Sequence, residues 1–221
     1  MAQTKSKKTL YAEVLAWFAE NMPSAQSELH FENPFQLLVA VILSAQCTDK
    51  RVNMVTPALF ARFPDARSMS RSDEAEIYSY IKSVSYPNNK ASHLLGMAQM
   101  LESDYNGQVP EKMEDLLRLP GVGRKTANVM TAVAFEKPAM AVDTHVFRVS
   151  ARIGLTQNAK TPLETERQLV TNIPQDMLGT AHHWLLLHGR YVCLARKPKC
   201  EACGLRPYCA YYKALPKESK S

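Results

Sequence analysis

A glycine-rich turn and a lysine stand next to each other in residues 119–129. The order is Leu-Pro-Gly-Val-Gly-Arg-Lys-Thr-Ala-Asn-Val, with glycines at Gly121 and Gly123 and the lysine at Lys125. The glycines permit a tight turn and let backbone N–H groups come close to a ligand. We expect a helix to begin at about Arg124, and amides that converge at a helix N-terminus bind phosphate. The alternative is a plain connection between two helices that needs glycine only for its bend.

Lys125 is placed to act as a nucleophile. In the first turn of a helix, its ammonium would face the positive end of the macrodipole, which disfavours the charged form. Partial burial in a cleft would lower the pKa of the amine further. A neutral amine can attack an electrophilic carbon, whereas an ammonium cannot. The alternative is a surface lysine that only pairs with phosphates, which is the commoner role of lysine.

A carboxylate follows in the segment Ala-Val-Asp-Thr-His-Val-Phe-Arg, where it is Asp143. Asp143 precedes an apolar stripe at helical spacing, so it is a good helix N-cap. A carboxylate near a nucleophilic amine would also stabilise developing positive charge and assist proton transfer. For His145 we expect a structural or phosphate-facing role.

Four of the five cysteines fall in one short segment, as Cys193, Cys200, Cys203 and Cys209. In a reducing compartment such a cluster indicates metal ligands rather than disulfides. Zinc sites usually use two close cysteine pairs, and only one close pair is present. The spacing also differs from that of ferredoxins. Cys47 lies apart from the cluster, near an apolar segment, and we interpret it as a small core residue.

The charge of the chain favours a polyanionic partner. The sequence has 27 Lys and Arg against 21 Asp and Glu, a net charge of +6, although many basic proteins bind nothing acidic. Three of the cations, Arg196, Lys197 and Lys199, lie between the first two clustered cysteines. A loop fixed at both ends by metal ligation would present them rigidly to phosphates. The alternative is that they are only solvated.

Length and composition indicate a folded protein without a membrane segment. The 221 residues suffice for one large domain or for two small domains that share a cleft. A content of 46% hydrophobic and 22% charged residues is ordinary for a folded soluble protein. No apolar run is long enough to span a membrane, and the first residues are too polar and basic for a signal peptide. We therefore expect the protein to stay in a reducing cytoplasm.

The apolar periodicity is helical throughout, which predicts an all-α fold. Residues 110–118 should form the helix before the glycine turn. The run from Phe35 to Ala45 is apolar on all sides, so it should be a central buried helix. A further stripe stops at Asn106-Gly107, which is a helix terminator.

Two more helices are indicated by their ends. Residues 161–164, Thr-Pro-Leu-Glu, combine an N-cap, a proline at the first helical position and a capping-box acid. Another helix should end with residues 182–188, and Gly189 should be its C-terminal stop.

Several segments together resemble the endonuclease III family of DNA glycosylases. The glycine turn is similar to the Leu-Pro-Gly-Val-Gly-x-Lys-Thr-Ala form of its helix-hairpin-helix motif. The segment around Asp143 is similar to the family's Val-Asp-Thr-His string, and the cysteine spacing matches its C-terminal loop. The resemblance covers about residues 10–212. The matching segments are residues 43–46 with Asp49, 119–127, 142–145, 182–191 and 193–209.

The resemblance implies roles for individual residues. Lys125 would be the catalytic nucleophile and Asp143 the second catalytic residue. The four clustered cysteines would hold a [4Fe–4S] cluster. Gln46 would enter the space left by the everted nucleotide, and its alternative role is that of an ordinary helix-end amide. The other residues expected to contact DNA are Tyr86, Gly121, Gly123, Arg124, His145, Arg196, Lys197 and Lys199.

The resemblance also implies a fold, in which two helical domains have a DNA-binding groove between them. Residues 26–136 would form a helical barrel domain that contains the helix-hairpin-helix. Residues 1–25 would join residues 137–221 in a second helical domain with the iron–sulfur loop. Lys125 and Asp143 would face each other across the groove.

The implied activity is that of a bifunctional DNA glycosylase and AP lyase in base excision repair. Its partner would be double-stranded DNA with an oxidised pyrimidine or an abasic site. The enzyme would act as a monomer in the cytoplasm of a bacterial-type cell, associated with the nucleoid. The damaged base would be flipped out of the duplex. Lys125 would displace the base and form a Schiff base with the sugar, and β-elimination would then cut the strand on the 3′ side. One alternative is an adenine or other monofunctional glycosylase of the same fold, although the adenine enzymes use a glutamate where this chain has Ala40. The other is a non-catalytic DNA-structure or redox-sensing iron–sulfur protein.

One segment departs from the family pattern. The family commonly has a glycine, an apolar wedge and an aromatic residue where this chain has Ser85, Tyr86 and Pro87. That loop normally inserts into the duplex, and Tyr86 can still stack between bases. The alternative is that Pro87 holds the loop away from DNA and Tyr86 packs inside the protein.

Overall fold

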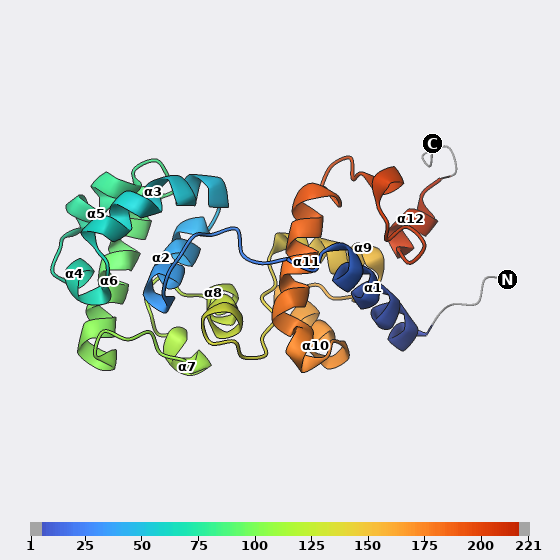
Figure 1. Ribbon diagram of the computed structural model, residues 1–221, viewed down its shortest axis with the longest axis horizontal. Coiled ribbons are helices and arrows are strands. Elements are labelled where there is room, and N and C mark those ends of the chain that lie inside the picture. Colours follow the sequence, from blue (N-terminus) through green and yellow to red (C-terminus); the bar gives the residue numbers. More distant parts are fainter. Residues whose placement is uncertain (1–5, 217–221) are drawn as a thin grey trace. The chain divides into compact units, whose positions relative to one another are not determined.

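The computed structural model describes residues 6–216, and every regular element in that range is helical (Figure 1). The prediction of an all-α fold is confirmed. The chain divides into two compact units. The middle unit is Ser27–Lys137, and the terminal unit combines Met1–Gln26 with Pro138–Ser221. No helix of the described residues is long and apolar enough to cross a membrane.

The middle unit is built around a helix that is buried on all sides. This helix, α2, begins at Pro34, and the Asn33 side chain accepts a hydrogen bond from the backbone of Gln36 as its N-cap. Every residue from Phe35 to Leu43 is buried, so the predicted central helix is confirmed. The helices of this unit are α2 (Pro34–Ser44), α3 (Asp49–Arg62), α4 (Ala66–Ser70), α5 (Glu74–Ile81), α6 (Pro87–Tyr105), α7 (Met113–Leu116), α8 (Arg124–Val129) and the π-helical turn Met130–Ala134.

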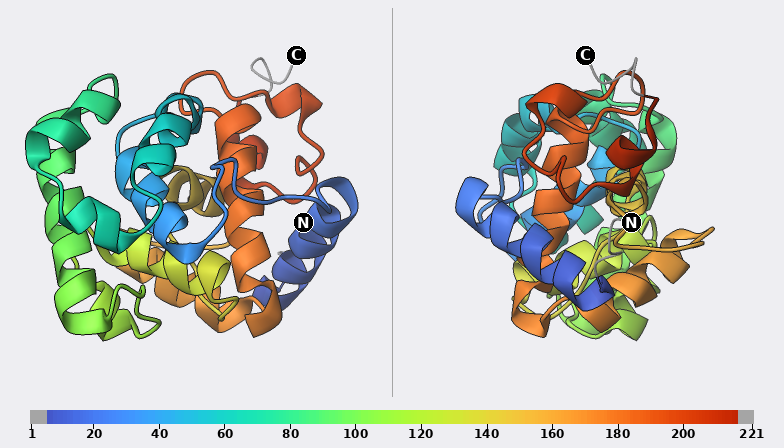
Figure 2. Two further views of the ribbon diagram at one scale, coloured as in Figure 1. Left: turned by 60° about the vertical axis from the view of Figure 1, so that its left-hand side comes forward. Right: turned by 90° about the vertical axis from the view of Figure 1, so that its right-hand side faces the viewer.

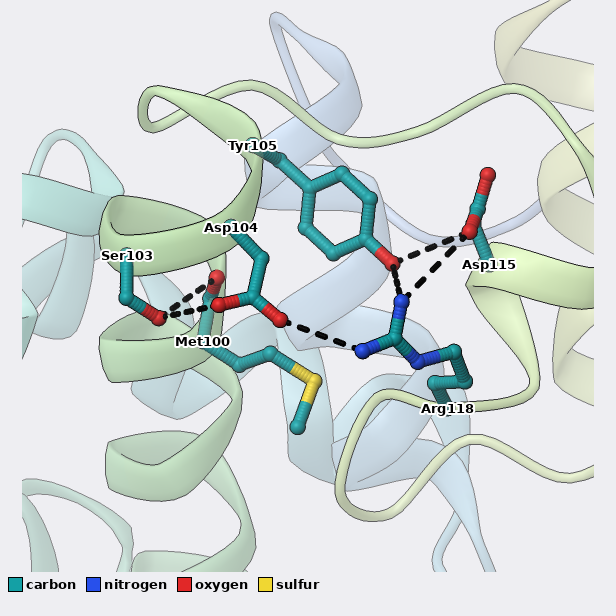
Figure 3. Close-up of polar contacts among 6 residues, drawn as sticks. All are labelled: Met100, Ser103, Asp104, Tyr105, Asp115 and Arg118. Carbon is teal, nitrogen blue, oxygen red and sulfur yellow. Dashed lines mark hydrogen bonds and ion pairs between the residues drawn. The ribbon is translucent and has the colours of Figure 1, made fainter.

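The long helix α6, drawn in green, runs along the middle unit and packs against α4 and α5 (Figure 2). It ends as predicted, because Asn106 adopts a left-handed conformation and the Gly107 amide donates to the Leu101 carbonyl. The end of α6 is joined to the segment before the glycine turn by Arg118, which donates to Asp104 and to the Tyr105 hydroxyl (Figure 3).

The predicted helix over residues 110–118 is wrong in its extent, since only Met113–Leu116 is helical. Lys112 is extended, and Glu111 pairs with Lys137 at 2.7 Å outside the helix. The helix stops early because the chain tightens into successive turns before Pro120, and a residue that precedes proline disfavours helical geometry.

The terminal unit joins the N-terminal helix to the second half of the chain. Phe18 stacks on Trp184 at a centroid distance of 5.7 Å, and the Trp184 indole donates to the Met22 carbonyl at 2.8 Å. The Tyr11 hydroxyl donates to the Leu155 carbonyl at 2.9 Å. The elements are α1 (Lys7–Asn21), α9 (Thr144–Ile153), α10 (Pro162–Asn172), a 3-10 turn (Gln175–Met177), α11 (Leu178–Tyr191), a second 3-10 turn (Cys200–Ala202) and α12 (Ala210–Ala214).

Two predicted helix ends in the terminal unit need correction. Gly189 is not a C-terminal stop, because α11 continues to Tyr191. A Cβ at Gly189 would lie 2.8 Å from the Cβ of His145, so glycine is needed for the close approach of α11 to α9. At α10 the Thr161 side chain is the N-cap, as expected, but Glu164 accepts from the amide of Lys160 rather than closing a strict capping box.

Candidate functional site

The glycine turn uses its two glycines for different reasons. Gly121 has a φ of 78°, and a Cβ there would lie 3.0 Å from the Cβ of His93. The protein itself therefore requires glycine at this position. Gly123 has an ordinary φ of −94°, and no atom lies within 4 Å of a Cβ built on it. The space outside Gly123 is open, which lets the backbone of a ligand come close to the turn.

The helix that follows the turn begins at Arg124, as predicted, and Gly123 is its N-cap. Because glycine has no side chain, the N-cap offers no acceptor to the first amides of α8. Lys125 is the second residue of this helix and is half-buried. The first turn of α8 therefore combines the positive end of a helix with an amine.

Asp143 caps α9 in the terminal unit. Its Oδ1 accepts from the amides of His145 at 2.9 Å and Val146 at 2.8 Å, so the predicted N-cap is confirmed. The second carboxylate oxygen, Oδ2, receives no hydrogen bond from the described part of the chain. Asp143 is half-buried, and only its Oδ1 takes part in the cap. Lys125 belongs to the middle unit and Asp143 to the terminal unit.

His145 is part of the junction between α9 and α11. Its Nδ1 lies 3.2 Å from the guanidinium of Arg148, which also donates to the carbonyls of Gly189 and Cys193. Of the two roles expected for His145, these contacts support the structural one.

The four clustered cysteines line one pocket of the terminal unit, beside Ile153, Leu205 and Tyr211. None of the four forms a disulfide. Burial raises the pKa of the Cys203 and Cys209 thiols, and the neighbouring cysteines raise it further. The sulfur atoms have specific neighbours: Cys193 lies 3.5 Å from the Arg152 guanidinium, Cys203 lies 3.5 Å from His188 Nε2, and Cys209 donates to the Arg152 carbonyl at 3.4 Å.

The four thiols that line this pocket are suitable ligands for an iron–sulfur cluster, because each thiolate of such a cluster binds a different iron.

His188 is a residue of this site that the sequence did not reveal. Its ring is 3% exposed and meets Trp17 and Phe18 edge to face. Burial lowers its pKa to about 4, so the ring is neutral at pH 7. Its Nδ1 finds no hydrogen-bond partner among the described residues, while Nε2 points at Cys203. The available signals were its apolar position in a predicted helix and its place in segment 182–191, which resembles the family.

The remaining predicted contact residues are accessible. Gln46 and Tyr86 have left-handed backbones, and Tyr86 is 62% exposed, so the alternative that Tyr86 packs inside the protein is wrong. The cations Arg196, Lys197 and Lys199 are all exposed. Cys47 is not a core residue, because it lies half-buried in the turn after α2.

Comparisons with known proteins assign the class of this fold and site. The sequence profile of the HhH-GPD superfamily of base excision DNA repair proteins matches residues 39–175, and that of the iron–sulfur binding domain of endonuclease III matches residues 193–209. The fold and the turn thus define a helix-hairpin-helix protein of base excision DNA repair.

Individual relatives narrow the assignment. Endonuclease III of Rickettsia felis is 47% identical over 195 residues, which cover 88% of this chain and 91% of that protein. The enzyme of Escherichia coli K12 is 42% identical over 199 residues, 90% and 94% of the two chains. A solved structure of a trapped endonuclease III–DNA covalent intermediate has a TM-score of 0.90 and 41% identity, and covers 95% of this chain and 98% of that chain.

The chain therefore belongs to the endonuclease III family. It is a DNA glycosylase and AP lyase of base excision repair, its partner is DNA, and it has a [4Fe–4S] cluster.

Proposed function

We propose that Lys125 is the nucleophile of this enzyme and that Asp143 assists it. In this mechanism the Lys125 amine attacks the sugar carbon that bears the damaged base, and the base departs. The resulting Schiff base makes β-elimination possible, which cuts the strand on its 3′ side. The Asp143 carboxylate stabilises positive charge on the sugar ring and transfers protons.

The observation that supports this proposal most directly is the environment of Lys125. The open space outside Gly123 admits a phosphate to the turn, and Lys125 follows in the first turn of α8. A backbone phosphate held there would bring the adjoining sugar towards the amine. For Asp143, the support is that only Oδ1 is used in capping α9.

Borohydride trapping on abasic DNA tests the nucleophile, since only an amine that forms a Schiff base leaves a covalent adduct. Lys125→Gln should abolish trapping and strand cleavage while DNA binding is largely retained. The matched control is Lys137→Gln, which removes an exposed lysine of the same unit that pairs with Glu111. Undiminished trapping in Lys125→Gln would show that another amine does the chemistry.

We propose that Cys193, Cys200, Cys203 and Cys209 are the four cluster ligands. Their common pocket supports this assignment, as does the profile match over the same residues. With its four cysteines bound to the cluster, the loop would be rigid. It would then present the cations Arg196, Lys197 and Lys199 to DNA phosphates.

Iron content tests the ligand assignment. The purified protein should be yellow-brown, with about four irons per chain, as a Cys₄-ligated [4Fe–4S] cluster requires. Cys209→Ala should lose iron and the associated absorbance, whereas Cys47→Ala, which changes the one cysteine outside the pocket, should keep both. Stoichiometric zinc without iron after anaerobic purification would overturn the assignment.

The proposal also includes the substrate, the oligomeric state and the location in the cell. The enzyme acts as a monomer on double-stranded DNA that carries an oxidised pyrimidine or an abasic site, in the nucleoid of the cytoplasm. The middle unit serves as the barrel domain with the helix-hairpin-helix, and the terminal unit serves as the domain with the iron–sulfur loop. The residues that contact DNA are Gln46, Tyr86, Gly121, Gly123, Arg124, Arg196, Lys197 and Lys199, with His145 supporting α9.

A further inference from the structure

Lys90 is a buried cation that faces backbone carbonyls instead of a carboxylate. The residue is 5% exposed, and its ammonium donates to the carbonyls of Leu43 and Ala45, each at 2.8 Å. These carbonyls stand at the C-terminus of α2, where a helix leaves its last acceptors unpaired and carries partial negative charge. The helix α2 has no basic residue in its own last turn. Lys90 on α6 therefore supplies the cap that α2 lacks.

Ser85 adds a second bond to the same place. Its hydroxyl donates to the carbonyl of Gln46 at 2.7 Å. The amide of Lys90 donates to the carbonyl of Tyr86 at 3.2 Å, so the loop that carries Tyr86 is fixed to the first turn of α6. Ser85 and Lys90 together thus donate to three backbone carbonyls at and just after the C-terminus of α2.

The two residues held by these bonds have an unusual backbone. Gln46 has a φ of 53° and Tyr86 a φ of 54°, in the left-handed region that residues other than glycine seldom adopt. Such conformations persist only where surrounding contacts impose them. Both side chains are exposed, and the bond from Ser85 joins the two loop tips directly.

We propose that Lys90 and Ser85 form a clamp that holds Gln46 and Tyr86 as one rigid insert for entry into the duplex. The proposal rests on the proposed function, in which these two side chains contact DNA. Lys90 and Ser85 are positioning residues, because they act through the loop backbones. The clamp also gives a reason for the departure at residue 85, since the glycine common in the family has no hydroxyl to bond Gln46.

Loss of the clamp should slow excision from duplex DNA, where the base must leave the stack. It should have little effect on single-stranded DNA, where the base is already unstacked. Lys90→Met keeps an apolar stem but removes both carbonyl bonds, and it should slow single-turnover excision from duplex DNA by tenfold or more. Trapping on a single-stranded abasic site should change less than threefold. Ser85→Ala should show the same pattern with a smaller loss of two- to fivefold. Lys82→Met, which changes an exposed lysine next to the loop, is the control and should alter neither substrate.

A double-mutant cycle separates the clamp from a general packing defect. If Lys90 acts through Gln46, Lys90→Met should have little further effect on duplex excision in a Gln46→Ala background. Equal losses on duplex and single-stranded substrates, together with a lower melting temperature, would overturn the clamp. If Lys90→Met does not fold, an unchanged duplex-to-single-strand ratio in Ser85→Ala overturns it as well. Failure of the proposed nucleophile is recognised separately, because Lys125→Gln would then still be trapped on single-stranded DNA.

Discussion

The substitution Gly189→Ala should destabilise the enzyme, although alanine is the better helix former. Gly189 lies inside α11, where it faces α9. A Cβ there would lie 2.8 Å from the Cβ of His145 and 3.0 Å from Cγ2 of Val149. The Cβ of His145 is attached directly to the backbone and cannot rotate away. The two helices would have to separate to admit the methyl group.

Two opposing contributions decide whether Gly189→Ala raises or lowers the free energy of unfolding. Replacing glycine by alanine in a helix interior stabilises by at most about 1 kcal/mol. Forcing an extra carbon into a packed contact destabilises by about 1–3 kcal/mol. Because the clash is with a Cβ, which is attached directly to the backbone, the cost of Gly189→Ala lies in the upper part of that range. The net loss in the free energy of unfolding is therefore about 1–2 kcal/mol. For a chain of this length, the melting temperature should fall by about 2–8 °C.

Thermal unfolding by circular dichroism measures this loss, and single-turnover excision measures its effect on the site. Because Asp143 is the N-cap of α9, a displaced α9 should also slow excision. The control for the melting temperature alone is Gly123→Ala, for which the structure offers open space and an ordinary φ. A melting temperature of Gly189→Ala that equals or exceeds that of the wild type would refute the argument.

Two further predictions concern DNA. Gly123→Ala should leave the melting temperature unchanged but weaken DNA binding by about tenfold, which corresponds to the loss of roughly one charge-assisted hydrogen bond. A fluorescence anisotropy titration measures the affinity, and an affinity equal to that of the wild type would mean that no phosphate approaches the turn. Aromatic–base stacking contributes about 1–3 kcal/mol, so Tyr86→Ala should reduce excision from a duplex by about ten- to a hundredfold. The same lesion in single-stranded DNA should change little, and Tyr86→Leu should recover most of the activity; an unchanged ratio between the two substrates would exclude a wedge at Tyr86.

Local signals were sufficient to predict several elements. The central helix α2 follows from an uninterrupted apolar run, the end of α6 from Asn106-Gly107, and the start of α9 from Asp143. In each of these cases the atoms that determine the structure lie within a few residues of each other. A sequence pattern records such contacts directly.

Contacts between distant residues left no comparable signal. Lys90 binds carbonyls that lie 45 and 47 residues away, and nothing in its neighbours distinguishes it from a solvated lysine. His188 likewise depends on Trp17 and Phe18 at the other end of the chain. The sequence predicts a helix stop at Gly189, because the actual reason for this glycine, the close approach of the His145 and Val149 side chains of α9, is remote in sequence.

The two glycines of the turn show how the structure changes the meaning of one residue type. In the sequence, the two glycines alone favour a bent connection between helices over a phosphate site. In the structure, Gly121 is required by its φ of 78° and by His93, so its presence says nothing about a ligand. Gly123 has no such requirement from the protein, and its open side borders the first turn of α8, which carries Lys125. Because neither its φ nor its surroundings require glycine at position 123, this residue agrees with the proposal that a DNA phosphate approaches the turn.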